Sequence, residues 1–217
     1  VDLVDKHTAP SILFAVTEDW YFWSHRQPMA AYLQQQGCEI SLATRFNEHQ
    51  SDCIGMGLEC IAVTFERSLR HPLRDLRAMF GLWRALRDTN PEIVHLVSHK
   101  PILLSVLALF ANPGTQFVAA FTGMGYLFSS GERRAWWVQR TVVLALRSLL
   151  RRANVSIIVQ NEEDRRLLQR ERIGRAGRTT IIAGVGVDTK VYAFSALDFT
   201  AAPIILLPAR LIRDKGV

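Results

Sequence analysis

Short apolar runs alternate along this chain with longer stretches in which apolar residues recur at helical spacing. The runs are rich in β-branched residues, do not alternate with polar ones, and cover residues 11–16, 39–43, 60–63, 93–97, 115–119, 156–159 and 179–183. Such runs are typical of parallel strands buried on both faces of a sheet. Helical spacing covers residues 24–36, 73–87, 99–110, 132–152 and 161–170. This alternation predicts an α/β domain with a Rossmann-like, doubly wound parallel sheet.

The segment at residues 73–87 shows the helical spacing clearly. Its apolar residues share one side, with arginines between them: Leu73, Leu76, Met79, Phe80, Trp83 and Leu86. This spacing predicts an amphipathic helix, which ends before the Asn90-Pro91 pair.

The pattern changes after residue 183. Residues 184–203 are small and irregular, which indicates a linker, and the apolar run at 204–207 then leads into a basic loop with a glycine. We interpret residues 1–186 as one complete α/β domain. Residues 187–217 are then the linker and the first strand and loop of a second Rossmann-like domain. In the alternative interpretation, that strand adds to the first sheet.

Composition limits the class of partner. The 217 residues are enough for one sizeable core, and the formal charge of +6 comes mainly from arginine. A positive excess favours phosphates, nucleic acid or an acidic lipid surface, while a basic protein without such a partner is the alternative. Nucleic acid is not expected, because no helix-turn-helix, zinc-finger or RNP pattern accompanies the basic residues.

Redox and metal chemistry are not indicated by the sequence. Cys38, Cys53 and Cys60 form no CxxC pair, which argues against a disulfide scaffold and fits a reducing cytosol. We expect no metal or other cofactor, since no D-x-D motif and no Cys/His cluster is present. No signal peptide opens the sequence, and the longest apolar run, 101–111, is too short to cross a bilayer. We therefore expect a cytoplasmic protein.

Candidate binding residues follow the predicted strands, because ligands of doubly wound sheets bind at the carboxyl ends of the strands. A dense aromatic and polar loop is predicted after the first strand, at Trp20, Tyr21, Trp23, His25 and Arg26. Aromatic faces pack on sugar rings, and Arg26 can hold a phosphate. The alternative is a hydrophobic cap over the helix end.

Two histidines stand near the end of the strand predicted at residues 93–97. His99 starts the next helix, where a neutral imidazole could hydrogen-bond sugar hydroxyls and a charged one could oppose phosphate. A structural role is the alternative for His99. His95 lies inside the strand and is the candidate for a structural histidine, although which of the two faces the ligand stays open.

Glycine and basic residues complete the candidate set. Gly123 and Gly125 allow a positive φ and a close backbone approach, or simply a tight turn. The full G-x-G-x-x-G dinucleotide fingerprint is absent. Arg210 and Lys215 follow the last predicted strand, next to Gly216, and suit a diphosphate, with a solvated basic loop as the alternative.

Several segments resemble, in the same order, family 4 glycosyltransferases of the GT-B architecture. The closing ARLIRDKGV, residues 209–217, resembles their R-L-x-x-x-K-G stretch, and AGVGVD, residues 183–188 with Gly184 and Gly186, is similar to the G-x-G-V-D segment at their domain junction. The other matching segments are VTEDWYFWSHRQPMAAYL (16–33), HLVSHKP (95–101), FTGMGYLFS (121–129) and VQNEEDRRLL (159–168). The resemblance spans nearly the whole chain.

The resemblance implies the N-terminal, acceptor-side domain of a retaining glycosyltransferase that helps to build cell-surface polysaccharides. Such an enzyme moves a sugar from a nucleotide-sugar donor to a glycan or polyprenyl-diphosphate-linked acceptor without a bound metal. It implies that Arg210 and Lys215 contact the donor diphosphate and that His99 lies beside the donor sugar. The remaining implied residues shape the binding cleft or face the acceptor: Gly123, Gly125, Gly184 and Gly186 for the first role, and Trp20, Tyr21, His25 and Arg26 for the second.

This sequence departs from the family in one loop and stops short of another motif. Many relatives carry a Gly-Gly pair in the first strand–helix loop, and this chain does not. The paired glutamates of the family's C-terminal domain lie beyond residue 217. We therefore expect the 217-residue chain alone to transfer no sugar.

Two other functions remain open at the level of sequence. One is a sugar-nucleotide epimerase built on the same GT-B plan. The other is a non-enzymatic scaffold that docks on acidic membranes through the helix at residues 132–152, where Arg133, Arg140, Arg147 and Arg151 lie near one face. For that helix, the alternative is a sheet-covering role with a solvated stripe. A peripheral place on the cytoplasmic face of the inner membrane is the corresponding expectation for location.

Overall fold

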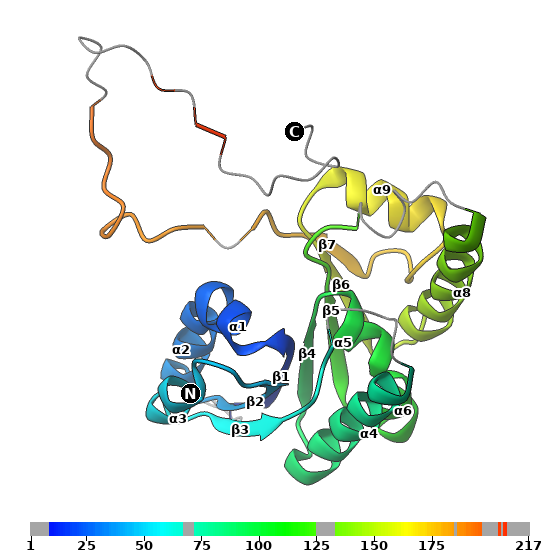
Figure 1. The fold of residues 1–217 in the computed structure, drawn as a ribbon, viewed down its shortest axis with the longest axis horizontal. Coiled ribbons are helices and arrows are strands. Elements are labelled where there is room, and N and C mark those ends of the chain that lie inside the picture. The colour runs from blue at the N-terminus through cyan, green and yellow to red at the C-terminus, as the bar shows by residue number, and fades with distance from the viewer. Residues whose placement is uncertain are drawn as a thin grey trace, which may run out of the picture. The chain divides into compact units, whose positions relative to one another are not determined.

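The computed structural model describes residues 9–66, 72–124, 133–184, 186–196, 204 and 206–207, without the side chains of residues 133–139. Strands and helices alternate in the order β1 (Ser11–Glu18), α1 (Asp19–His25), α2 (Gln27–Gln35), β2 (Glu39–Arg45), α3 (Gln50–Gly55), β3 (Glu59–Ala62), α4 (Pro72–Thr89), β4 (Ile93–Val97), α5 (His99–Leu104), α6 (Val106–Ala111), β5 (Gln116–Ala120), α8 (Arg133–Leu150), β6 (Val155–Val159), α9 (Glu162–Arg170) and β7 (Thr179–Ile181). Figure 1 shows this arrangement.

The strands form one parallel sheet with the order β3-β2-β1-β4-β5-β6-β7. Ile12 of β1 is in register with Ile40 of β2 on one side and with Ile93 of β4 on the other. The chain therefore builds outward from β1 to β3, returns across the sheet, and builds outward again from β4. The predicted doubly wound sheet is confirmed, and its switch point lies between β1 and β4.

Helices cover both faces of the sheet, because successive side chains of each buried strand point to opposite sides. Leu13 and Ala15 of β1 pack in a core cluster with residues of α4 and α5, whereas Ile12 and Phe14 pack in a second cluster with residues of α1 and α2. Strands packed on both faces have no polar side, which explains their unbroken apolar sequence. Cys38, Cys53 and Cys60 are free thiols.

Helix α4 forms where the spacing predicts a helix, but it buries a different set of residues from the apolar side that the sequence displays. Of that side, Leu86 is buried, while Leu73, Leu76 and Phe80 are exposed to 76%, 45% and 51%. The buried face carries Ala78, Leu82, Ala85 and Leu86. Ala78 and Ala85 on this face, and Gly81 beside it, are small, so the helix can approach the sheet closely. A Cβ on Gly81 would lie 3.4 Å from a Val63 methyl.

The segment after β1 is helical as far as His25, so the loop predicted there is wrong except at Arg26, which separates α1 from α2 and divides the helix predicted at residues 24–36. Strand β1 continues to Glu18, and α1 begins at once with Asp19, whose carboxylate accepts the amide of Trp20 at 2.8 Å. The sequence pattern also missed α3, and the helix predicted at residues 99–110 is divided at Ser105. The Ser105 hydroxyl donates to the carbonyl of Ile102 at 2.7 Å.

The chain divides into two compact units, Val1–Val185 and Gly186–Val217. In the second unit, the amides of Val191 and Tyr192 both bond to the carbonyl of Asp188, which makes a turn. Ile204, Leu206 and Leu207 are not in a β-strand, contrary to the strand predicted at residues 204–207. A strand needs a hydrogen-bonded neighbour, and no pairing partner for it occurs among the described residues. That this unit opens a second Rossmann-like domain stays a prediction.

Among the helices that the structure describes, none combines the length and the apolar character that a membrane span requires.

Candidate functional site

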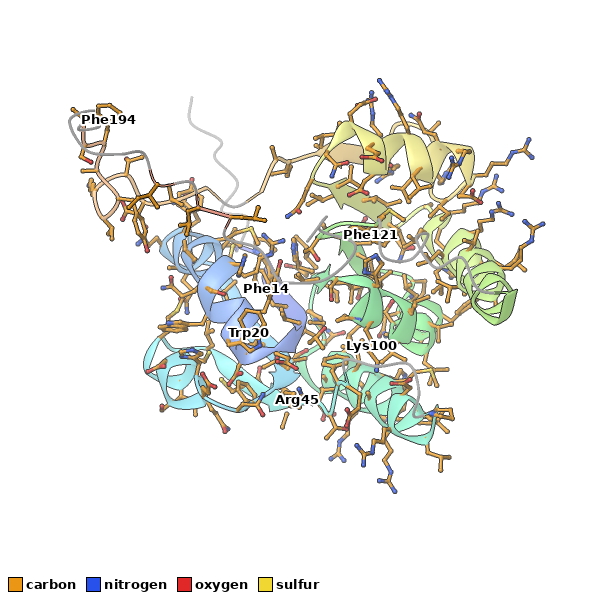
Figure 2. All side chains as sticks on the ribbon, turned by 45° about the horizontal axis from the view of Figure 1, so that its top comes forward. Phe14, Trp20, Arg45, Lys100, Phe121 and Phe194 are labelled. Atoms are coloured by element: carbon orange, nitrogen blue, oxygen red, sulfur yellow. The ribbon has the colours of Figure 1, made fainter. Side chains whose placement is uncertain are left out.

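The candidate site lies at the switch point of the sheet, where β1 and β4 end side by side. The hydroxyls of Thr17 and Ser98 lie 3.2 Å apart across these two strands, and the Ser98 amide donates to the carbonyl of Ala120 in β5 at 2.9 Å. We refer to Thr17, Ser98 and His99 as the switch-point site. Figure 2 shows Trp20 and Arg45 on the β1–β2 part of the molecule and Phe121 on the part that follows β5.

Ser98 has a backbone conformation that non-glycine residues rarely adopt, with φ 72° and ψ 169°. Such a conformation costs on the order of 1–3 kcal/mol and persists only where the surroundings enforce it. Here the backbone bond to Ala120 and the contact with Thr17 hold the residue in place. The strained turn makes His99 the first residue of α5 and places it at the carboxyl edge of the sheet.

The ring of His99 is partly buried beside the ring of Phe121, with centroids 5.5 Å apart. Its Nε2 is buried and has no hydrogen-bond partner among the described residues. Burial lowers the pKa of His99 below its usual value, and the carboxylate of Asp164 opposes this effect only in part. The imidazole is therefore neutral near pH 7, which suits a hydrogen bond with a hydroxyl better than pairing with phosphate.

His95 has a different environment. It lies within β4, is almost fully buried, and its ring centroid is 5.2 Å from that of Phe14. Burial, and then the charge of Arg26, lowers the pKa of His95 to about 3. His95 and His99 are four residues apart, but the strand and the helix direct their rings to Phe14 and Phe121, respectively. No group of three or more metal-ligating side chains occurs among the described residues.

The predicted aromatic residues after β1 lie on α1 and contact one another. The rings of Tyr21 and His25 are stacked with centroids 4.3 Å apart, and His25 Nδ1 lies 2.6 Å from the Ser24 hydroxyl. The indole of Trp20 is 38% exposed and donates to Glu18 at 2.6 Å. These rings form an aromatic helix surface instead of a loop, which leaves Trp20 the most accessible of them to a sugar.

Arg26 separates α1 from α2 and is partly buried. Its Nε is buried without a hydrogen-bond partner among the described residues, and its charge reaches His95 strongly enough to lower the pKa of that ring. Arg26 is therefore a cationic member of the predicted acceptor-side set whose charge acts on a residue of β4.

Two acidic residues at the end of β1 organise this edge, and neither was predicted from the sequence as a functional residue. Asp19 is fully buried, and its carboxylate accepts the amides of Asn47, Glu48 and His49 at 2.7, 2.8 and 2.9 Å. Glu18 accepts from the side chains of Trp20 and Arg45. Asp19 thus ties the segment after β2 to the start of α1. The signal in the sequence was an acidic pair one residue beyond the apolar run at 11–16.

Asp164 lies in the segment VQNEEDRRLL, residues 159–168, but was not predicted as a functional residue. It is buried, and its carboxylate accepts the amide of Met124 and the Asn161 side chain, both at 3.1 Å. Asn161 in turn caps α9 by accepting the Asp164 amide at 2.7 Å. These bonds hold the turn after β5 against the start of α9, beside His99.

Three of the four predicted glycines are described by the structure, and each of the three has a positive φ. Gly123 has a φ of 122°, and a Cβ added to it would meet no other atom within 4 Å, so the backbone angle and not crowding requires glycine. Gly184 and Gly186 both have a φ of 68°. Gly125, Arg210 and Lys215 lie outside the described residues.

Helix α8 covers the sheet. Val143, Leu146 and Leu150 are buried in the core, and the guanidinium of Arg147 donates to the carbonyl of Glu171 at 2.5 Å. Arg147 is thus engaged with the end of α9 and does not belong to a free basic stripe. The side chains of Arg133 and Trp136 lie outside the described residues.

A hollow of about 450 Å³ lies elsewhere, at the amino ends of the strands, where Ser11, Glu39 and Glu59 contribute to its lining. None of the predicted binding residues that the structure describes borders it. Two of its polar side chains already bond to each other, since Ser41 donates to Glu59 at 2.9 Å.

Residues 23–184 match the model of the glycosyl transferase 4-like domain. In sequence, the chain is 24% identical over 205 residues to N,N'-diacetylbacillosaminyl-diphospho-undecaprenol alpha-1,3-N-acetylgalactosaminyltransferase of Campylobacter jejuni. That alignment covers 88% of this chain and 54% of the relative. The chain therefore spans about half the length of the curated relative that it matches.

Solved structures with the same fold include a sucrose-phosphate synthase from Thermosynechococcus elongatus, with a TM-score of 0.58 and 14% identity over 84% of this chain and 49% of that one. An Anabaena protein in complex with UDP and glucose also has a TM-score of 0.58, with 12% identity over 86% of this chain and 47% of that one. At these identities the similarity establishes the fold.

Proposed function

This chain belongs to the glycosyl transferase 4-like domain family, and from that membership we propose that it forms the acceptor-side half of a retaining glycosyltransferase. The observation that carries the proposal is the family match over residues 23–184, which contains Ser98, His99 and Asp164. The strained Ser98 turn and the neutral His99 lie where doubly wound sheets bind ligands.

The proposed substrates are a nucleotide sugar and a glycan or polyprenyl-diphosphate-linked acceptor, used in the synthesis of cell-surface polysaccharide. The similar Campylobacter enzyme is named for a diphospho-undecaprenol substrate, and the similar Anabaena structure contains UDP and glucose. Both support the substrate classes without identifying the sugar. Location in the cytoplasm follows from these substrates, and we propose that no metal takes part.

In the proposed mechanism, His99 acts on the donor sugar through hydrogen bonding. A neutral imidazole can accept from or donate to a hydroxyl, and its unpartnered Nε2 is the available atom. Asp164 positions this region by holding the Met124 amide, and Arg26 offers a cation for an acceptor phosphate. Aromatic faces such as that of Trp20 pack on acceptor sugars.

Departure of the nucleoside diphosphate needs stabilisation of negative charge. Preorganised cations and amides supply such stabilisation in a low-dielectric site. We assign this task to Arg210 and Lys215, with Gly123, Gly125, Gly184 and Gly186 as the positions where the backbone can approach the substrates closely. The 217-residue chain alone should transfer no sugar, because the paired glutamates that the family resemblance implies are not in it.

The test is a transfer assay with the full-length protein, a panel of nucleotide sugars and a polyprenyl-diphosphate-linked sugar acceptor, with products followed by mass spectrometry. Transfer should require both substrates and should fall by at least about tenfold in His99→Gln, the effect of losing one hydrogen bond to the reacting group. His49→Gln is the matched control, because His49 lies at the start of α3 and pairs with Asp52.

Two results would overturn the proposal. One is the absence of transfer to every acceptor by folded protein that still binds a nucleotide sugar. The other is conversion of the donor sugar to its epimer, with release of free nucleotide and no need for an acceptor, which indicates an epimerase.

A further inference from the structure

We propose that the outer face of α4 is a docking surface for an anionic lipid bilayer. We define this α4 outer face by its exposed residues Leu73, Leu76 and Phe80, together with the arginines beside them, Arg74, Arg77, Arg84 and Arg87. The proposal concerns a surface apart from the switch-point site and can fail or succeed independently of the proposed transferase activity.

The apolar part of this face is a stripe and not a scatter of single residues. Leu73, Leu76 and Phe80 recur at intervals of three and four, so they lie on one side of the helix. Their exposed fractions are 76%, 45% and 51%. The solvent side of a sheet-covering helix is ordinarily polar, and a contiguous exposed apolar stripe marks an interaction surface.

The stripe cannot turn inward, because the opposite side of α4 is anchored. Ala78 and Leu82 are completely buried, and Asp75 forms an ion pair with Lys100 of α5 at 2.6 Å. Both of these charged side chains are largely buried, so rotation of the helix would separate charges away from water, which is costly. The outward orientation of Leu76 and Phe80 is therefore a fixed property of the fold.

Charge identifies the occupant of this surface. Arg74 is paired with Glu66 at 2.9 Å and Arg84 with Asp88 at 3.4 Å, both on an exposed surface. Among the described residues, Arg77 has no ion-pair partner. Arg87 lies over the ring of Trp83 at 5.7 Å. Arginines beside leucine, phenylalanine and tryptophan on one helix are the composition that lies flat in the interface of an anionic membrane.

A second copy of the chain is a poorer occupant than a membrane. An isologous contact through this face would bring the arginines of two copies together, and like charges in an interface disfavour binding. Anionic phosphates, in contrast, neutralise Arg77 and its neighbours while the apolar stripe enters the acyl boundary. The helix has 18 residues and a length of ~27 Å, which gives an extended line of contact.

The experiment measures binding of the full-length protein to vesicles by flotation. Vesicles that contain phosphatidylglycerol should bind it, vesicles of phosphatidylcholine alone should bind it at least about tenfold more weakly, and added salt should weaken binding to the anionic vesicles. Leu76→Ser combined with Phe80→Ser should reduce binding by about tenfold or more. Arg77→Gln should reduce it by about fivefold, the share of one arginine near an anionic surface.

Tyr32→Ser is the matched control. Tyr32 is a large side chain exposed to 60% on α2, which packs against the opposite face of the sheet from α4. This variant should bind vesicles as the unaltered protein does. Circular dichroism on each variant checks that the fold is retained, since all the substituted side chains are exposed.

Absence of vesicle binding would overturn the proposal, as would binding that Leu76→Ser with Phe80→Ser leaves unchanged. A third contrary result is that the unaltered protein self-associates in analytical ultracentrifugation and the double substitution abolishes this self-association, while vesicles bind neither the unaltered protein nor the variant. That result would make the α4 outer face an interface between copies of the chain.

Discussion

The hydroxyls of Thr17 and Ser98 lie 3.2 Å apart and join the ends of β1 and β4 at the point where the strand order reverses. Ser98 at this point has a φ of 72° and a ψ of 169°. A strained residue held by its neighbours is common where backbone and side chain must be positioned for a ligand. The pair therefore marks the place from which His99 begins α5.

Replacement of Ser98 tests this strain. Ser98→Gly and Ser98→Ala both remove the hydroxyl, but only glycine adopts this backbone conformation freely. We expect Ser98→Gly to be more stable than Ser98→Ala by about 1 kcal/mol or more in urea denaturation. Ser24 in α1 is the control site, where the order should reverse because alanine is the better helix former by about 1 kcal/mol. The same order at both sites would contradict the strain at Ser98.

Protonation of His95 should destabilise the protein in acid. The unfolded pKa is near 6.5, and burial together with Arg26 lowers the folded pKa to about 3. The unfolded chain then binds the proton first, so stability is complete above pH 6.5 and falls as the pH decreases toward 3. The slope contributed by this residue approaches ~1.4 kcal/mol per pH unit.

His95→Phe should flatten this dependence between pH 7 and pH 5 in denaturant titrations, since a phenyl ring cannot take up the proton. Part of the slope should remain because burial also lowers the pKa of His99. An unaltered slope in His95→Phe would show that the buried ring is not the source.

Asp19 should stabilise the segment after β2 through its charge. Burial alone would raise the pKa of Asp19, but hydrogen bonds from the amides of His49, Asn47, Glu48 and Trp20 outweigh it and lower the pKa. Its contribution is therefore present above the unfolded value near 3.8 and is lost as the pH falls below it. At neutral pH, Asp19→Asn should lower the free energy of unfolding by about 2 kcal/mol.

Asp52→Asn is the control for Asp19. Asp52 is also acidic, but its side chain is 49% exposed and its partner is the His49 ring. Its replacement should change the free energy of unfolding by less than about 0.5 kcal/mol. If both substitutions lower the free energy of unfolding equally, the buried hydrogen bonds of Asp19 stabilise the protein no more than the exposed pair of Asp52 does.

Asp164 should position the turn after β5 and adjust the neighbouring histidine. Asp164→Asn weakens the bond to the Met124 amide and removes a negative charge that raises the pKa of His99. In the full-length enzyme we expect kcat/KM to fall by about tenfold, as for loss of one charge-assisted hydrogen bond. The acid limb of the pH–rate profile should move to lower pH, because the pKa of His99 then falls further.

Glu163→Gln removes an exposed charge from the same turn of α9 and should leave both the rate and the pH profile unchanged. A loss of rate in Asp164→Asn without a shift of the profile would restrict Asp164 to a purely structural role.

The order of the strands could be predicted from the sequence because burial on both faces leaves parallel strands without polar residues, whereas α3 and most of α1 were missed. Strand β4 has the predicted bounds, and the bounds of β6 differ from the prediction by one residue. The candidate residues after β4 and β5 were also accessible to sequence reasoning, since ligand positions follow the carboxyl ends of strands. His99 and Gly123 do lie in such positions.

What the sequence alone determined about this protein is the parallel sheet, because hydrophobic periodicity records which segments are buried; the edge at which it places the candidate site stays a prediction. Only the tertiary structure decided which side of α4 is buried, that Trp20 and Tyr21 lie on a helix, and that Asp19 and Asp164 hold the turns. Periodicity cannot decide between two apolar sides of a helix: the small residues Ala78 and Ala85 are buried because they allow close approach to the sheet. The roles of Asp19 and Asp164 depend on amides that are distant in sequence, and a contact of that kind exists only once the chain has folded.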